Sequence, residues 1–252
     1  MLMTHQLVPH LKRLKLSGVL ETLETRHTQA VEAELPYVDF LAGLLEDEVE
    51  RREQKKLAMR LKRAAVDTQK TLETFDFRFN PSVRRRQVQD LATCQFVEAH
   101  RNVLIVGPAG VGKSHLAQGL GHEACRKGYT VLFQPTHKVL AYLHAGHADH
   151  TFERRMAAVL RYDVLILDDF GLRPPPEQQV GILYDIVAER YERSSIIVTS
   201  NRDFEEWPSI FGDPLIASAA LDRLAHDAHR IVIEGRSYRT GRVPSPPQED
   251  ES

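Results

Sequence analysis

The chain has 252 residues, of which 42% are hydrophobic, so it can bury one sizeable core and carry a small additional domain. Its formal net charge of −2 excludes a polycationic protein, and any contact with nucleic acid must come from local basic patches. The two cysteines have no CxxC spacing and no run approaches 18 consecutive apolar residues, which excludes a disulfide framework and a membrane span and predicts a cytoplasmic protein.

Residues 1–75 are predicted to form a small helical N-terminal domain. Leu7, Leu11 and Leu14 recur at helical spacing, and a second apolar series runs from Tyr37 to Val49. Pro36 precedes this series and is typical of the start of a helix. We therefore expect at least two helices before the main domain.

Charge is uneven along this part of the chain. Residues 44–50 are acidic, whereas residues 51–86 hold twelve basic and four acidic side chains, a net charge of +8. Two interpretations stay open: a solvated helix face, or a surface that contacts the phosphate groups of duplex DNA. The second predicts DNA contacts from Lys55, Lys56, Arg60, Lys62, Arg63, Arg84, Arg85 and Arg86.

After Asn80-Pro81, short apolar runs alternate with helical segments. Five runs read as buried strands, at 102–107, 129–133, 162–167, 194–200 and 230–235. Continuous apolar strands separated by helices predict an α/β fold, with a parallel five-stranded sheet between two helix layers. We place this domain at 76–242, and expect the proline-rich, acidic residues 243–252 to be disordered.

The strongest motif is G-P-A-G-V-G-K-S at 107–114, a full match to G-x-x-x-x-G-K-[ST]. It follows an apolar run and precedes a helical segment, so the loop amides and the helix N-terminus face a phosphate. Lys113 is expected on the β- and γ-phosphates of ATP and Ser114 on Mg²⁺. The predicted nucleotide contacts are Gly107, Pro108, Ala109, Gly110, Val111, Gly112, Lys113, Ser114 and His115.

Two adjacent aspartates, Asp168 and Asp169, end the run VLILDD. Because side chains alternate along a strand, we expect them to point in different directions and to have different roles. Asp168 is predicted to bind Mg²⁺ through water, and Asp169 to orient or deprotonate the attacking water. Many ATPases have a glutamate at the second position; aspartate is one methylene shorter, which predicts slow hydrolysis.

Further polar residues fit a phosphate-hydrolysing site. Asn201 ends the run SIIVTSN, where its side chain can reach the γ-phosphate or the attacking water. Arg223, in LDRLAHDAH, is a candidate for stabilising phosphoryl charge in its own or a neighbouring subunit, with a surface salt bridge as the alternative. Arg190 and Arg239 are further candidates, with structural roles as the alternative.

Several motifs occur in one order along nearly the whole chain. They are GPAGVGKSHLA, VLILDDFG, the ERY before IIVTSN, the stretch from Trp207 to Asp213, LDRLAHDAH and GRSYR, preceded by an F-L-x-x-L-L-x-x-E-x-x-x-R pattern from Phe40 to Arg52. Together they resemble the IstB-type ATPases, which are helper proteins of a bacterial insertion-sequence transposase. These are AAA+ proteins similar to the helicase loader DnaC.

The resemblance implies a protein that binds ATP and assembles as a homo-oligomer on duplex DNA, with each nucleotide at a subunit interface. The oligomer would remodel target DNA and recruit and stimulate an IstA-like transposase. By position, Asp168 and Asp169 carry over as the acidic motif, Asn201 as the γ-phosphate sensor and Arg223 as the arginine finger acting in trans. The usual helical lid is not expected, because the chain ends soon after GRSYR.

Two other functions stay open at this point. A replicative helicase loader would share the same ATPase core and differ in its partner. A small-molecule kinase would share the phosphate-binding loop, but it would need a substrate pocket and a mobile basic lid that the sequence does not suggest.

Overall fold

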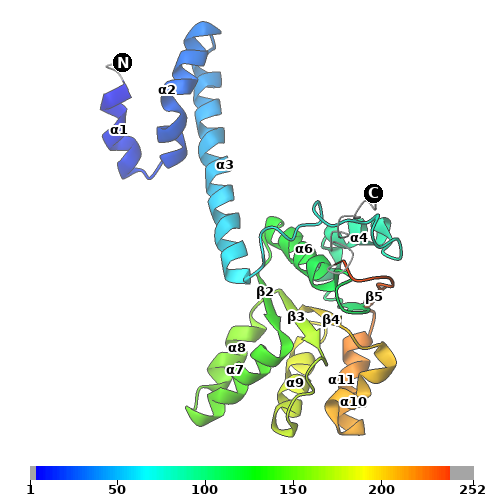
Figure 1. The fold of residues 1–252 in the computed structure, drawn as a ribbon. Coiled ribbons are helices and arrows are strands. Elements are labelled where there is room, and N and C mark those ends of the chain that lie inside the picture. Colours follow the sequence, from blue (N-terminus) through cyan, green and yellow to red (C-terminus); the bar gives the residue numbers. More distant parts are fainter. Residues whose placement is uncertain (1–3, 239–252) are drawn as a thin grey trace, which may run out of the picture. The chain divides into compact units, whose positions relative to one another are not determined.

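The structure is a computed structural model that describes residues 4–238 (Figure 1). The chain divides into two compact units, residues 1–59 and residues 60–252. The predicted tail and Arg239 lie outside the described residues. Among residues 4–238, none of the helices combines the length and the apolar character that a membrane span requires.

The first unit is helical, as predicted. It is built from α1 (Thr4–Arg13), α2 (Ser17–Glu32) and most of α3 (Tyr37–Ala64), which begins directly after Pro36. Its small core joins Val19 and Leu23 of α2 to Leu44 of α3. Leu11 of α1, Leu16 and Phe40 pack against this core, so the three helices bury their apolar faces together.

The second unit is built on a five-stranded parallel sheet in the order β2-β3-β4-β1-β5. All five strands lie within or next to the predicted apolar runs, which confirms the predicted sheet. The strands are β1 (Val103–Val106), β2 (Val131–Pro135), β3 (Val164–Phe170), β4 (Ser195–Ser200) and β5 (His229–Val232). Every residue of β1 and β4 is buried, because helices cover both faces of the sheet.

Helices cover the sheet on two sides and make a three-layer sandwich (Figure 1). One side carries α4 and α6, and the other carries α7, α8, α9 and α11. The helical segments are α4 (Arg85–Ala92), α5 (Gln95–Glu98), α6 (Lys113–Arg126), α7 (Thr136–Ala148), α8 (Phe152–Leu160), α9 (Glu177–Arg190), the 3-10 helix η1 (Phe204–Glu206), α10 (Pro208–Phe211) and α11 (Pro214–Ala225).

Strand β3 is irregular where the two aspartates lie. Leu167 pairs with Val198 of β4 and Phe170 pairs with Ser200, so β3 holds one residue more than β4 over this interval. This is a β-bulge, and Asp169 within it has a left-handed backbone with φ of 53°. The bulge interrupts the regular alternation of side chains along β3. The expectation that Asp168 and Asp169 point in different directions because they are neighbours in a regular strand is therefore wrong in its reason.

Candidate nucleotide-binding site

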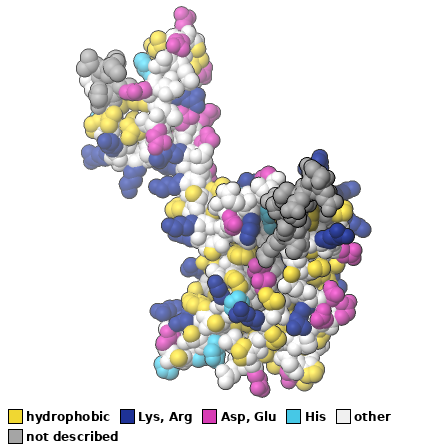
Figure 2. Space-filling model, viewed as in Figure 1, with side chains coloured by type: hydrophobic (Ala, Val, Ile, Leu, Met, Phe, Trp, Pro, Cys, Tyr) yellow, Lys and Arg dark blue, Asp and Glu magenta, His cyan; other side chains and the backbone are white. Residues whose placement is uncertain are grey.

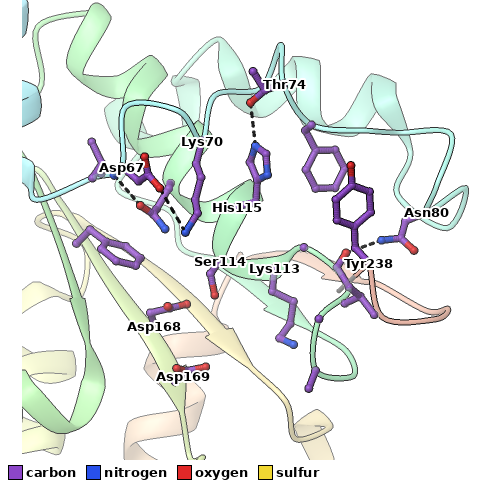
Figure 3. A pocket seen from close by; sticks show the side chains of 18 of the residues that line it. Asp67, Lys70, Thr74, Asn80, Lys113, Ser114, His115, Asp168, Asp169 and Tyr238 are labelled. Atoms are coloured by element: carbon purple, nitrogen blue, oxygen red, sulfur yellow. Dashed lines mark hydrogen bonds and ion pairs between the residues drawn. The ribbon is translucent and has the colours of Figure 1, made fainter. Parts of the chain in front are cut away.

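A cavity of about 940 Å³ lies over the N-terminus of α6 and the end of β3 (Figure 3). Seven of the nine predicted nucleotide contacts line it, from Ala109 to His115. Asp168, Asp169 and Asn201 line the same cavity, although they come from different strand ends. Its volume is within the range of small-ligand pockets, which run to about 1,000 Å³. The structure thus brings the predicted phosphate loop and the predicted acidic residues to one space.

Gly107 and Pro108 are the two predicted nucleotide contacts that do not line the cavity, and both bond the side chain of Lys113. The Lys113 ammonium donates hydrogen bonds to the carbonyl oxygens of Gly107, at 2.8 Å, and Pro108, at 2.6 Å. Gly107 has φ of 149°, and a Cβ there would lie 2.1 Å from the carbonyl oxygen of Ile233. No side chain fits at this position, so the glycine is required by the close approach of the segment after β5.

His115 joins residues 71–75, which precede the sheet, to the start of α6. Its Nε2 lies 2.9 Å from the carbonyl oxygen of Thr71 and 3.2 Å from the hydroxyl of Thr74. A carbonyl oxygen only accepts, so Nε2 carries the proton in this contact. The ring also packs edge-on against Phe75, with centroids 5.4 Å apart. His115 therefore holds residues 71–75 beside the phosphate loop as well as lining the cavity.

The two aspartates share one hydroxyl partner. The Thr199 hydroxyl donates to Oδ1 of Asp168, and it accepts the backbone N–H of Asp169 at 3.1 Å. Thr136 donates its hydroxyl to the carbonyl oxygen of Asp168 at 2.9 Å. Asp168 is 7% exposed, and both aspartate side chains lie below Ser114 in Figure 3. The bulge brings both to the same cavity, where regular alternation would have separated them.

The oxygen atoms at this end of the cavity suit a magnesium ion bound with a nucleotide. Ser114 offers a hydroxyl and Asp168 a carboxylate, the hard donors that Mg²⁺ prefers. Residues 4–238 contain no group of three or more His, Cys, Asp or Glu side chains arranged to hold a metal by themselves. Mg²⁺ is usually held by one or two protein oxygens together with substrate phosphates, so the residues present fit that arrangement.

Two of the three candidate arginines lie within residues 4–238, and their surroundings differ. Arg223 is on α11, outside the lining of the cavity, and its Nη1 donates to the carbonyl oxygen of Ala219 at 2.7 Å. Its guanidinium lies over the ring of Tyr184, 5.7 Å from the centroid. Arg190 is 1% exposed and bonds the carbonyl oxygens of Leu160, Asp163 and Ser195, and burial lowers its pKa to about 10. These contacts join the end of α8 to the starts of β3 and β4.

Some residues of the site were not anticipated. Lys70 lines the cavity and extends toward Ser114 in Figure 3, with its ammonium 3.8 Å from the carboxylate of Asp67. Phe79 and Tyr238 form an edge-on ring pair, with centroids 4.9 Å apart, at another part of the lining. These residues precede the first strand or follow the last one. Their approach to the loop depends on the tertiary fold, and no local spacing in the sequence reveals it.

The predicted DNA-contacting residues differ in their partners and in their exposure. Lys56 pairs with Glu53 at 2.7 Å, and the Arg85 guanidinium lies 5.8 Å from the ring centroid of Phe77. Lys62 and Arg63, in the last turn of α3, are exposed. On the visible face of the second unit, Lys and Arg side chains are scattered among other side chains (Figure 2). The DNA contacts stay a prediction.

The sequence is similar to a known protein family and to proteins of bacterial insertion sequences. A family model described as IstB-like ATP binding protein matches residues 9–243. An ATP-binding protein in an insertion sequence of Mycobacterium tuberculosis is 40% identical over 235 residues, which cover 93% of this chain and 94% of that protein. The ATP-binding protein of insertion sequence IS21 of Pseudomonas aeruginosa is also 40% identical, over 93% of this chain and 89% of that protein.

Solved structures share the fold of the second unit. The DnaC helicase loader aligns with a TM-score of 0.52 and 23% identity, covering 66% of this chain and 97% of that one. The replication initiator DnaA, bound to AMPPCP and single-stranded DNA, aligns with a TM-score of 0.53 and 22% identity, covering 68% of this chain and 52% of that one. These likenesses show the AAA+ fold. The family match over residues 9–243 and the two insertion-sequence relatives at 40% identity show that the chain belongs to the IstB-like ATP-binding proteins.

Proposed function

We propose that this protein is an ATP-hydrolysing AAA+ protein that assembles on duplex DNA and recruits a transposase to it. The observation that carries the proposal is the single cavity lined by Lys113, Ser114, Asp168 and Asp169. It occurs in a chain 40% identical to ATP-binding proteins of insertion sequences. The cavity supports the chemistry, and the relatives support the biological setting.

The residues that line the cavity have different roles in phosphoryl transfer. Lys113 leaves the carbonyl oxygens of its own loop and binds the β- and γ-phosphates, which offer full negative charge. Ser114 and Asp168 hold Mg²⁺, which neutralises charge on the phosphate oxygens when bound. Asp169 orients the attacking water and accepts its proton, and Asn201 contacts the γ-phosphate. Each of these groups lines the same cavity.

Arg223 acts, in this proposal, on the nucleotide of a neighbouring subunit. It does not line the cavity of its own chain, and its guanidinium is steadied by Ala219 and Tyr184. An arginine supplied from outside stabilises the charge that develops on the transferred phosphoryl group. Hydrolysis then requires a homo-oligomer with nucleotide at its interfaces.

The test compares ATP-dependent assembly of wild-type protein with that of Lys113→Ala on duplex DNA, by electron microscopy with and without ATP. Lys127→Ala is the matched control, since it removes an exposed lysine just past the other end of α6. Wild type and the control should form nucleotide-dependent oligomers, and Lys113→Ala should not. Equal assembly by Lys113→Ala and wild type would refute the cavity as the nucleotide switch.

The partner is tested separately. We expect the ATP-bound assembly to retain a purified transposase of the same insertion-sequence class, and not a hexameric replicative helicase. Retention of the helicase alone would favour a helicase loader, which has the same ATPase core. The insertion-sequence relatives are the reason to place the transposase first.

A further inference from the structure

The hydroxyl of Thr199 lies between Asp168 and Asp169, although Thr199 is about thirty residues away from them in the sequence. It is the next-to-last residue of β4, it is fully buried, and its hydroxyl contacts both Asp168 and Asp169. The direction of this chain of hydrogen bonds is determined, because a backbone N–H only donates and a carboxylate only accepts. The proton of the Thr199 hydroxyl therefore faces Asp168, and its lone pair faces the amide of Asp169.

The two contacts constrain different properties of the site. The bond to Oδ1 of Asp168 restrains the rotation of that carboxylate. The bond from the amide of Asp169 holds a backbone with φ of 53°, which is uncommon for a residue other than glycine. One hydroxyl thus orients the carboxylate beside Ser114 and stabilises the bulge that directs the second carboxylate.

The adjacent residue provides a comparison within the same strand. Ser200 is also fully buried, and its hydroxyl also crosses from β4 to β3, where it donates to the carbonyl oxygen of Phe170 at 2.8 Å. It accepts the backbone N–H of Arg202 at 3.0 Å. Ser200 therefore makes the same kind of strand-to-strand bridge as Thr199, but it bridges to backbone and not to a carboxylate of the cavity.

We infer that Thr199 is a positioning residue for Mg²⁺-dependent ATP hydrolysis, acting through Asp168 and Asp169. The inference rests on the proposed ATPase function. Partners that orient a metal-binding carboxylate commonly change metal affinity or activity by about 10- to 100-fold when they are removed. The expected signature is a weakened response to Mg²⁺ with an intact phosphate loop.

The experiment uses three full-length variants: Thr199→Val, which replaces the hydroxyl with a methyl of similar size; Thr199→Ser, which keeps the hydroxyl; and Ser200→Ala. ATP hydrolysis is measured across a Mg²⁺ titration, and binding of a fluorescent ATP analogue is measured in EDTA. We expect Thr199→Val to raise the Mg²⁺ concentration for half-maximal hydrolysis about tenfold or more. Thr199→Ser should restore it, and binding in EDTA should stay as in wild type.

Ser200→Ala distinguishes an effect on the position of the carboxylates from an effect on the stability of the fold. It should lower the melting temperature without moving the Mg²⁺ half-point, since its partners lie outside the carboxylates. An unchanged half-point in Thr199→Val, or an equal shift in Ser200→Ala, overturns the inference. If Thr199→Val does not fold, Thr199→Ala takes its place in the same comparison. Failure of wild type to hydrolyse ATP at any Mg²⁺ concentration would instead refute the proposed function.

Discussion

Glu48 connects the two long helices of the N-terminal unit, and its removal tests how that unit is stabilised. Its carboxylate accepts the backbone N–H of Gly18 at 2.5 Å and that of Val19 at 3.4 Å. Residue Leu16 caps α2 and has no side-chain hydrogen bond to offer. Glu48 on α3 therefore supplies the oxygen that a serine or aspartate cap normally provides. Its other oxygen accepts Nε of Arg52 at 2.6 Å.

The expected loss on Glu48→Ala follows from these contacts. The amides of Gly18 and Val19 both lose their acceptor, which costs about 1–1.5 kcal/mol for each. The Arg52 pair adds about 0.5 kcal/mol at most, because the Arg52 side chain is 54% exposed. The total is about 3 kcal/mol, which is comparable with the ~3–5 kcal/mol that a single core of this size supplies. Glu48→Gln keeps an acceptor and should lose only about 1 kcal/mol.

The assay is hydrogen exchange of the α2 amides, followed by mass spectrometry at neutral pH. A loss of 3 kcal/mol corresponds to exchange faster by about two orders of magnitude in Glu48→Ala. Glu50→Ala, an exposed position on the same helix, is the control and should change little. Equal protection of α2 in Glu48→Ala and Glu50→Ala would refute the capping role.

Acid provides a second measurement on the same carboxylate. Burial by itself would raise the pKa of Glu48, but the Arg52 guanidinium and the amides of Gly18 and Val19 lower it below its ordinary value. A lowered folded-state pKa contributes stability above the unfolded pKa, about 4.3, and that contribution disappears as pH falls through the folded value. Glu48→Gln should abolish this part of the acid dependence of α2 exchange.

Three further predictions test the proposed ATP hydrolysis and the proposed DNA contacts. Mixing Arg223→Ala subunits with Asp169→Ala subunits should restore part of the hydrolysis that each lacks, measured as phosphate release, and no rescue at any ratio would argue against action in trans. Reversing the charge of Lys62 and Arg63 should flatten the dependence of DNA affinity on salt. Reversing the charge of Arg51, which pairs with Glu21 at 2.8 Å, should change that slope less. Equal slopes in the two variants would mean that this segment is a solvated helix face and does not contact DNA. Asp169→Asn should keep ATP binding and the melting temperature but lose hydrolysis.

The main architecture could be predicted from local patterns. Strands β1 and β4 are buried along their whole length and β3 along nearly all of it, and buried parallel strands are mostly apolar, so these runs are visible without any knowledge of pairing. The phosphate loop is likewise local, since its glycines and Lys113 lie within eight consecutive residues. Both signals depend only on neighbours in the sequence, and the structure confirms the sheet that they predict.

Contacts between distant residues could not be predicted in this way. The role of Gly18 appears only when α2 meets α3: a Cβ there would lie 2.7 Å from Cα of Glu48. In the same way, Tyr238 donates its backbone N–H to the carbonyl oxygen of Gly110 at 2.9 Å, across more than half of the chain. The spacing of residues in the sequence does not predict these two contacts, because they form only in the tertiary fold.

Asp169 belongs to a motif that is visible in the sequence, but the tertiary fold determines its backbone conformation. A glutamate would reach further toward a water molecule, yet the bulge places this residue at φ of 53°. Left-handed backbone is tolerated best by glycine, asparagine and aspartate, whose short polar side chains bond locally, and it is less favourable for longer side chains. Aspartate therefore accommodates this backbone at a lower cost than glutamate, although Glu34 and Glu192 adopt φ of 51° and 56° elsewhere in the chain. Asp169→Glu should accordingly lower the melting temperature relative to Asp169→Asn, even where the longer side chain speeds hydrolysis. Equal melting temperatures would mean that the bulge places no demand on the residue, and that the shorter carboxylate reflects the chemistry alone.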